Sequence, residues 1–133
     1  MKTIVVTGGR EWDNPVVVEG ALTVHGSKGD TLIHGNCRGL DRQAGAIAKN
    51  LGFIVDSMPA EWGRYGKGAG PIRNRQMLDR QPDLVLSFHP NLEQSRGTKD
   101  CVEEAIRRGI PVMHHDGRNA YWLNGPNVAD VTF

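Results

Sequence analysis

The sequence has few of the features that mark exported or membrane-spanning proteins. It contains only two cysteines, Cys37 and Cys101, and its start shows neither the basic stretch nor the apolar core of a secretory signal. No apolar run approaches the ~20 residues that span a bilayer. We therefore expect a reduced, cytoplasmic protein without a disulfide framework and without a membrane partner.

Net charge is almost absent as well. Sixteen Lys and Arg residues stand against fifteen Asp and Glu residues. Because no overall field would draw the protein to nucleic acid, any basic surface must be local. The length of 133 residues fits one domain with its own core.

Short β-branched segments alternate with segments of helical periodicity along the chain. This pattern predicts strands at 3–7, 31–34, 53–55, 83–88 and 110–113, and helices at 15–25, 40–51, 71–80 and 98–108. Such alternation favours parallel pairing and right-handed crossovers. We predict a single three-layer α/β domain, residues 1–114, with a doubly wound, mainly parallel five-stranded sheet. Residues 115–133 would form a C-terminal extension that packs on this domain.

Ligands of doubly wound sheets bind beyond the carboxyl ends of the strands, where the strand order reverses. Four segments rich in glycine or arginine are expected there. They are Gly8-Gly9-Arg10, the turn from His34 to Asp41, the connection 59–70 and Arg96-Gly97-Thr98. Neither a GxGxxG fingerprint nor a Walker lysine motif is present, which argues against ordinary NAD and ATP-hydrolase sites.

Two glycine turns could bring backbone amides close to a phosphate. Gly8, Gly9 and Arg10 supply the first turn, and the second is formed by His34, Gly35 and Asn36, with Asp41 in the helix beyond. The alternatives are plain turns and a structural histidine at position 34. Cys37, near a helix start, could be a reactive thiol, but no histidine at a recognisable spacing would activate it.

The connection 59–70 is long and glycine-rich, as many binding loops are. Trp62 and Tyr65 could stack on a base while Lys67 contacts phosphate, or the aromatic rings could only pin the loop to the body. Arg73 and Asn74 follow in the first turn of the predicted helix. A cation at the positive helix end is explained if it meets an anion.

The segment Arg96-Gly97-Thr98 stands at the start of the last predicted helix. Thr98 could cap this helix and also offer its amide and hydroxyl to phosphate; a simple N-cap is the alternative. Adjacent histidines at a strand end, as in His114-His115-Asp116, rarely point at one ion. We expect neither a metal nor a cofactor.

Taken in order, these motifs resemble the SLOG superfamily, and more narrowly its YspA/cpYpsA-related branch, which is often found in bacteria and their phages. The block Gly-Lys-Gly-Ala-Gly-Pro-Ile-Arg-Asn-Arg at 66–75 is the most specific part, and the similarity covers about residues 2–113. The resemblance implies a Rossmann-like nucleotide-binding domain, a ligand that contains a ribose phosphate, and a homodimer.

Residue by residue, the resemblance carries over in part. Arg73 is similar to the active-site arginine of the LOG phosphoribohydrolases, and Gly97-Thr98 to the end of their phosphate loop. Cys101 stands where those enzymes have the glutamate that assists N-glycosidic cleavage. An unperturbed thiol is mostly uncharged at neutral pH, so it cannot replace that carboxylate.

Three functions remain open at this point. The first is binding or sensing of a nucleotide or ribose-phosphate compound. The second is LOG-like hydrolysis of a nucleoside monophosphate, with Arg73 and a carboxylate from Asp100, Glu103 or Glu61. The third is DprA-like binding of single-stranded DNA through the basic segment 64–80, which the near-neutral charge disfavours.

Overall fold

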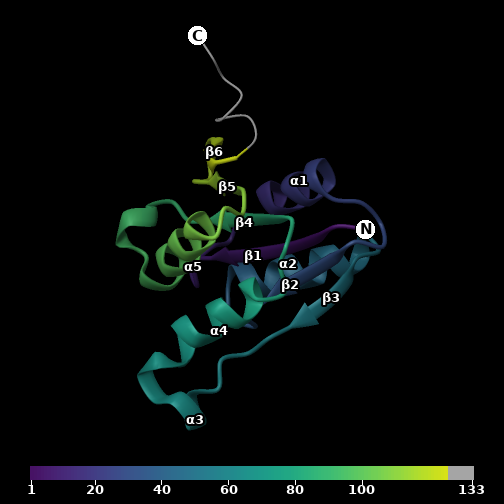
Figure 1. Ribbon diagram of the computed structural model, residues 1–133. Coiled ribbons are helices and arrows are strands. Elements are labelled where there is room, and N and C mark those ends of the chain that lie inside the picture. Colours follow the sequence, from purple (N-terminus) through teal and green to yellow (C-terminus); the bar gives the residue numbers. More distant parts are fainter. Residues whose placement is uncertain (126–133) are drawn as a thin grey trace.

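The computed structural model describes residues 1–125 (Figure 1). The elements follow in the order β1 (Thr3–Gly8), α1 (Pro15–His25), β2 (Thr31–His34), α2 (Leu40–Asn50), β3 (Ile54–Ser57), α3 (Trp62–Tyr65), η1 (Gly66–Gly68), α4 (Ala69–Leu78), β4 (Leu84–Phe88), η2 (Leu92–Gln94), α5 (Arg96–Arg107), β5 (Val112–His115) and β6 (Ala120–Asn124). None of the helices in this part of the chain is long and apolar enough to cross a membrane.

The strands form one sheet in the order β3-β2-β1-β4-β5-β6, in which only β6 runs antiparallel to its neighbour. This confirms the predicted doubly wound, mainly parallel α/β fold. Strand order reverses between β1 and β4, so a crevice opens beyond the carboxyl ends of these two strands.

The prediction of five strands was wrong, because β6 adds a sixth. Asp116 closes the β5–β6 hairpin: its carboxylate accepts hydrogen bonds from the amides of Arg118 and Asn119 at 2.8 and 2.7 Å. The β6 strand is only partly buried and lacks a clear apolar pattern, although Asp116-Gly117 is a typical hairpin signal. Residues 115–125 therefore continue the sheet, and residues 126–133 of the predicted extension lie outside the described residues.

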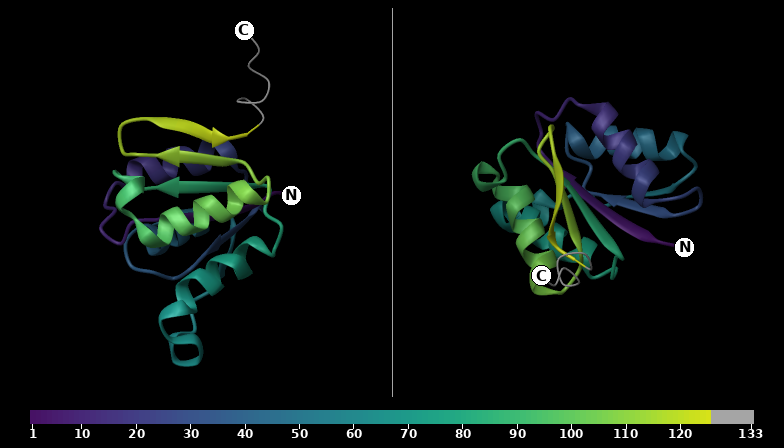
Figure 2. Two further views of the ribbon diagram at one scale, coloured as in Figure 1. Left: turned by 60° about the vertical axis from the view of Figure 1, so that its left-hand side comes forward. Right: turned by 90° about the horizontal axis from the view of Figure 1, so that it is seen from above.

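Two helix pairs cover the two faces of the sheet (Figure 2). Side chains alternate along β1: Ile4 and Val6 pack with α1 and α2, whereas Val5 packs with α4 and α5. This alternation is the expected period of two in a strand that is buried on both faces. These two cores hold one helix pair on each face of the sheet, and the crevice lies between the pairs.

Two helix starts differ from the predictions. The connection 59–70 contains α3 and η1, and α4 begins at Ala69 rather than Pro71, so Arg73 lies in the second turn and the predicted helix-dipole argument does not apply to it. The short α3 projects beyond the sheet (Figures 1 and 2). Helix α5 begins at Arg96, with Ser95 as its N-cap; Thr98 donates its amide to the Ser95 hydroxyl at 3.1 Å and is not the cap itself.

Candidate functional site

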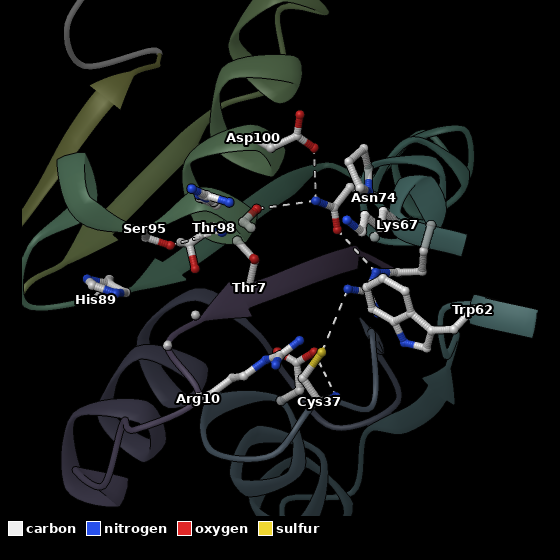
Figure 3. Close-up of a pocket in the computed structure, with 18 residues that line it drawn as sticks. Thr7, Arg10, Cys37, Trp62, Lys67, Asn74, His89, Ser95, Thr98 and Asp100 are labelled. Carbon is white, nitrogen blue, oxygen red and sulfur yellow. Dashed lines mark hydrogen bonds between the residues drawn. The ribbon is translucent and has the colours of Figure 1, made fainter. Parts of the chain in front are cut away.

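A cavity of about 530 Å³ lies at the reversal of strand order (Figure 3). It gathers most of the site residues that the sequence predicted, from the loops after β1, β2 and β4 and from α3 to α5. Those that line it are Gly8, Gly9, Arg10, Asp41, Trp62, Lys67, Arg73, Asn74, Gly97, Thr98 and Asp100. This position agrees with the general rule for doubly wound sheets.

Six predicted residues do not line this cavity: His34, Gly35, Asn36, Tyr65, Glu61 and Glu103. Other residues that line it were not predicted, among them Thr7, His89 and Ser95, while Cys37 and Arg96 belong to segments expected there but were not named as ligand contacts. Thr7 and His89 stand at the ends of β1 and β4. Their position at a strand end was the signal that could have found them.

Arg73 crosses from α4 to the loop after β2. Its Nη1 donates to the Gly35 carbonyl at 2.6 Å, its Nε donates to Asn74 Oδ1 at 3.1 Å, and its Nη2 lies 3.7 Å from the Cys37 sulfur. The side chain is buried and still lines the cavity. Arg73 therefore holds the two loops together and presents positive charge to the cavity.

The backbone amides of the turn after β2 bind the side-chain carboxylate of Asp41. Asp41 Oδ2 accepts hydrogen bonds from the amides of Gly35 at 3.0 Å and Cys37 at 3.3 Å, and the amide of Asn36 donates to His34 Nδ1 at 2.9 Å. The amides predicted to hold phosphate are thus used within the turn. Burial raises the pKa of Asp41 to about 6, against the lowering effects of these amides and of Arg73 and Arg10.

We expect the Asp41 carboxyl to titrate near pH 6 by ¹³C NMR. Because the folded pKa lies above the ordinary value of 3.8, the protonated carboxyl favours the folded state. This contribution is complete below about pH 4 and is lost as the pH rises through 6; two pKa units correspond to about 3 kcal/mol.

The Asp41→Asn variant should lose this pH dependence, so the difference in free energy of unfolding between it and the wild type should change by about 2–3 kcal/mol across this window. Asp79→Asn, at an exposed position, serves as the control. A titration of Asp41 near pH 4 would show that burial does not dominate its pKa.

The loop after β1 is held by close packing. The Gly9 amide donates to the Phe88 carbonyl at 3.0 Å, and a Cβ at Gly8 would lie 2.5 Å from Leu40 Cγ. Arg10 follows with an exposed side chain that lines the cavity. The glycines therefore position Arg10 more than they offer amides to a ligand.

The N-terminus of α5 offers open donors. Ser95 Oγ accepts the Thr98 amide, whereas within residues 1–125 the amides of Arg96 and Gly97 have no hydrogen-bond acceptor. A Cβ at Gly97 would meet nothing within 4 Å, so space for a ligand adjoins this helix end. Free amides and the helix dipole together favour a negatively charged group.

Asn74 and Asp100 connect this helix end to α4. Asn74 Nδ2 donates to the Gly97 carbonyl at 3.2 Å and to Asp100 Oδ2 at 3.0 Å (Figure 3).

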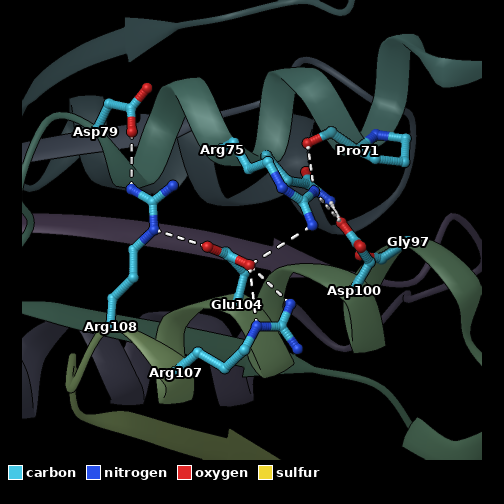
Figure 4. A network of polar contacts seen from close by, with 9 residues as sticks. Pro71, Arg75, Asp79, Gly97, Asp100, Glu104, Arg107 and Arg108 are labelled. Carbon is cyan, nitrogen blue, oxygen red and sulfur yellow. Dashed lines mark hydrogen bonds and ion pairs between the residues drawn. The ribbon is translucent and has the colours of Figure 1, made fainter.

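Arg75 lies 3.5 Å from Asp100 and from Glu104, and Glu104 also pairs with Arg107 and Arg108 (Figure 4). Hydrogen bonds from Arg107 and Arg108 lower the pKa of Glu104 to about 2. This network fixes α4 and α5, and with them Asn74 beside Gly97.

Cys101 lies beneath the cavity and does not line it. The side chain is fully buried, and burial raises the pKa of its thiol to about 12. The thiol is therefore neutral at physiological pH. It supplies neither a nucleophile nor a negative charge to a ligand.

The histidines of β5 have structural partners. Ser87 and His114 share a hydrogen bond of 2.7 Å between Oγ and Nδ1, and His114 Nε2 donates to the His89 carbonyl at 3.1 Å. His115 Nδ1 donates to the Ser87 carbonyl at 3.1 Å. Within residues 1–125 no three His, Cys, Asp or Glu side chains are grouped to hold a metal ion.

Charge in the cavity is mixed but mainly positive. Arg10, Lys67, Arg73 and Arg96 line it, against the carboxylates of Asp41 and Asp100. Asp100 is already held by Asn74 and by Arg75. The arrangement can bind an anion beside a polar, hydrogen-bonding wall, with the Trp62 ring at one side.

Comparison with known proteins assigns the chain to a family. The family model described as "YspA, cpYpsA-related SLOG family" matches residues 2–65, which include the loops after β1 and β2 and the short α3. The block from 66 to 75, on which the resemblance also rested, lies beyond this match. A relative named "Gene 61 protein", from Mycobacterium phage D29, is 36% identical over 122 residues, covering 86% of this chain and 96% of the relative. The chain belongs to the YspA, cpYpsA-related SLOG family.

Proposed function

We propose that this protein binds or senses a nucleotide or another ribose-phosphate compound in the cavity between β1 and β4. Membership of the SLOG family supports a nucleotide-related function at a coarse level. The observation that carries the finer proposal is the open N-terminus of α5, which faces a cavity lined by four cationic side chains. Phosphate is the ligand group that such a helix end and such charges favour.

In the proposed complex the phosphate lies at the amides of Arg96 and Gly97. Asn74 and Asp100 stand beside this point and can exchange hydrogen bonds with ribose hydroxyls. Trp62 is half exposed and lines the cavity, so its ring can stack on a base. The base itself is not specified, because stacking accepts any planar ring.

The geometry favours binding over hydrolysis. Cys101 is neutral and buried, and Glu61 and Glu103 are exposed residues that do not line the cavity. Among the three carboxylates predicted for catalysis, only Asp100 lines it, and Asp100 already accepts a hydrogen bond from Asn74 and pairs with Arg75. LOG-like hydrolysis remains the alternative, and it would depend on Asp100.

Binding of single-stranded DNA finds less support. In the predicted basic segment, Arg73 is buried, Arg75 pairs with Asp100 and Glu104, and Arg80 pairs with Asp56 at 2.6 Å. Phosphate contacts along a strand need solvent-facing cations. The homodimer that the resemblance implies is a separate proposal, tested by sedimentation velocity.

Nucleotides and ribose-phosphate compounds at millimolar concentration should raise the melting temperature of the purified protein and stay intact. Arg96→Gln should weaken the affinity about tenfold, since it removes one charge-assisted contact to phosphate. Arg64→Gln is the matched control, because Arg64 is exposed on α3 and does not line this cavity.

Chromatography of the same samples separates binding from hydrolysis. Released base that disappears in Asp100→Asn would replace the binding proposal with the hydrolase. An unchanged melting temperature with every compound would contradict both.

A further inference from the structure

A second cavity, of about 400 Å³, adjoins the first. Arg10, Cys37, Trp62 and Arg73 line both, so the two cavities share a border. The second one lies between the start of α2 and the segment that leads to α3. A ligand in the first cavity could therefore extend into the second past Trp62 and Arg10.

The second cavity differs from the first in its charge. Four arginines line it, Arg10, Arg38, Arg42 and Arg73, and among residues 1–125 no Asp or Glu lines it. The first cavity, by contrast, includes Asp41 and Asp100. A concave surface with charge of one sign selects an anionic group strongly.

Arg42 is the most informative of these arginines. It is the third residue of α2, where the helix dipole disfavours a cation, and within residues 1–125 it has no ion-pair partner. Arg38 stands just before this helix and pairs with Glu11 at 2.7 Å, but both side chains are largely exposed, so that pair stabilises the chain little. Within residues 1–125, no ion pair explains Arg42, and Arg38 has only this exposed one.

We propose that the ligand carries two separated anionic groups, one at the start of α5 and the other in the arginine-lined cavity at the start of α2. Its chemical class is a nucleotide with a second phosphate-bearing part, either a nucleoside bisphosphate or a dinucleotide. The inference rests on the proposed function, because the first anionic group is the phosphate placed there. Arg10 and Arg73, at the border, contact the part of the ligand that joins the two groups.

Isothermal titration calorimetry tests this with three compounds that carry the same base: the nucleoside 5′-monophosphate, the 3′,5′-bisphosphate and a 5′-phosphorylated dinucleotide joined through a 3′,5′-phosphodiester, in which a ribose separates the two phosphates. The wild type should bind one of the last two at least about tenfold more tightly than the monophosphate. The bisphosphate and the dinucleotide distinguish the two possible sources of the second anion.

Arg42→Gln should weaken binding of the tighter ligand about tenfold and leave the monophosphate affinity unchanged. Arg96→Gln, in the first cavity alone, should weaken both, and Arg64→Gln should weaken neither. Arg42 is exposed, so its variant should fold, which the melting temperature checks.

Equal affinity of all three compounds for the wild type would overturn the two-anion ligand, and so would an Arg42→Gln variant that affects every compound alike or none. Those results would leave the proposed function intact. If no compound binds the wild type, the proposed function itself fails and this inference fails with it.

Discussion

Arg73→Met should abolish measurable nucleotide binding and lower the free energy of unfolding by about 2–4 kcal/mol. The guanidinium is buried and donates to the Gly35 carbonyl and to Asn74 Oδ1. Methionine fills much of the space but leaves both acceptors without their donor, and an unpaired buried polar group costs about 1–3 kcal/mol. The same change removes positive charge beside the buried Asp41 carboxylate.

Urea denaturation and calorimetry measure the two effects. Arg75→Met, two residues further along α4, is the matched control: Arg75 is 40% exposed, its ion pairs are 3.5 Å long, and its 3.0 Å hydrogen bond to the Pro71 carbonyl is exposed, so we expect a loss below about 1 kcal/mol. Arg73→Lys retains the charge without the planar fork and should fall between the wild type and Arg73→Met in both stability and affinity. Full nucleotide affinity in Arg73→Met would remove Arg73 from the binding site.

Gly39→Ala should destabilise the fold by about 3 kcal/mol or more. Gly39 has a φ of 78° and a ψ of −124°, a conformation that alanine rarely adopts. A Cβ there would lie 2.5 Å from the Arg10 carbonyl carbon and 2.6 Å from the Gly9 carbonyl oxygen, and these backbone atoms cannot rotate away. The loops after β1 and β2 would have to separate.

Gly20→Ala should change the free energy of unfolding in the opposite direction. A Cβ at Gly20 meets nothing within 4 Å, and the residue lies in α1, so alanine should stabilise the protein by about 0.5–1 kcal/mol. Urea denaturation compares the two variants directly. Gly39→Ala at wild-type stability would mean that the two loops do not approach as closely as the structure places them.

Much of the fold follows from the sequence because its signals are local. Strand β1 is a short β-branched run, and α1 carries an N-cap at Asn14 with Pro15 behind it, so both were predicted at nearly their observed bounds. The site could be located for the same reason, since glycine and arginine gather after the strands. Strand β6 was missed, because a half-exposed edge strand shows little periodicity.

The partners within the site could not be predicted from spacing. The turn from His34 to Cys37 looks like a phosphate loop until Asp41 folds back onto its amides. Arg73 looked like a helix-end cation, but it reaches Gly35, 38 residues away in sequence. Such contacts depend on side-chain direction in the assembled sheet, which local patterns do not encode. The second cavity was not predicted either: Arg38 lies in the turn that was expected at the site, but its spacing from Arg42 does not show that both line a separate cavity.

The most direct test of the central proposal is an ¹H–¹⁵N NMR titration of the protein with nucleoside monophosphates at millimolar concentration. We expect saturable shifts of the Arg96 and Gly97 amides and of the Trp62 indole, with the ligand intact at the end. These three residues line one cavity, so common saturation would place a nucleotide between the start of α5 and Trp62. An absence of saturable shifts, or shifts confined to the outer surface of α3 and α4, would contradict the proposed binding site.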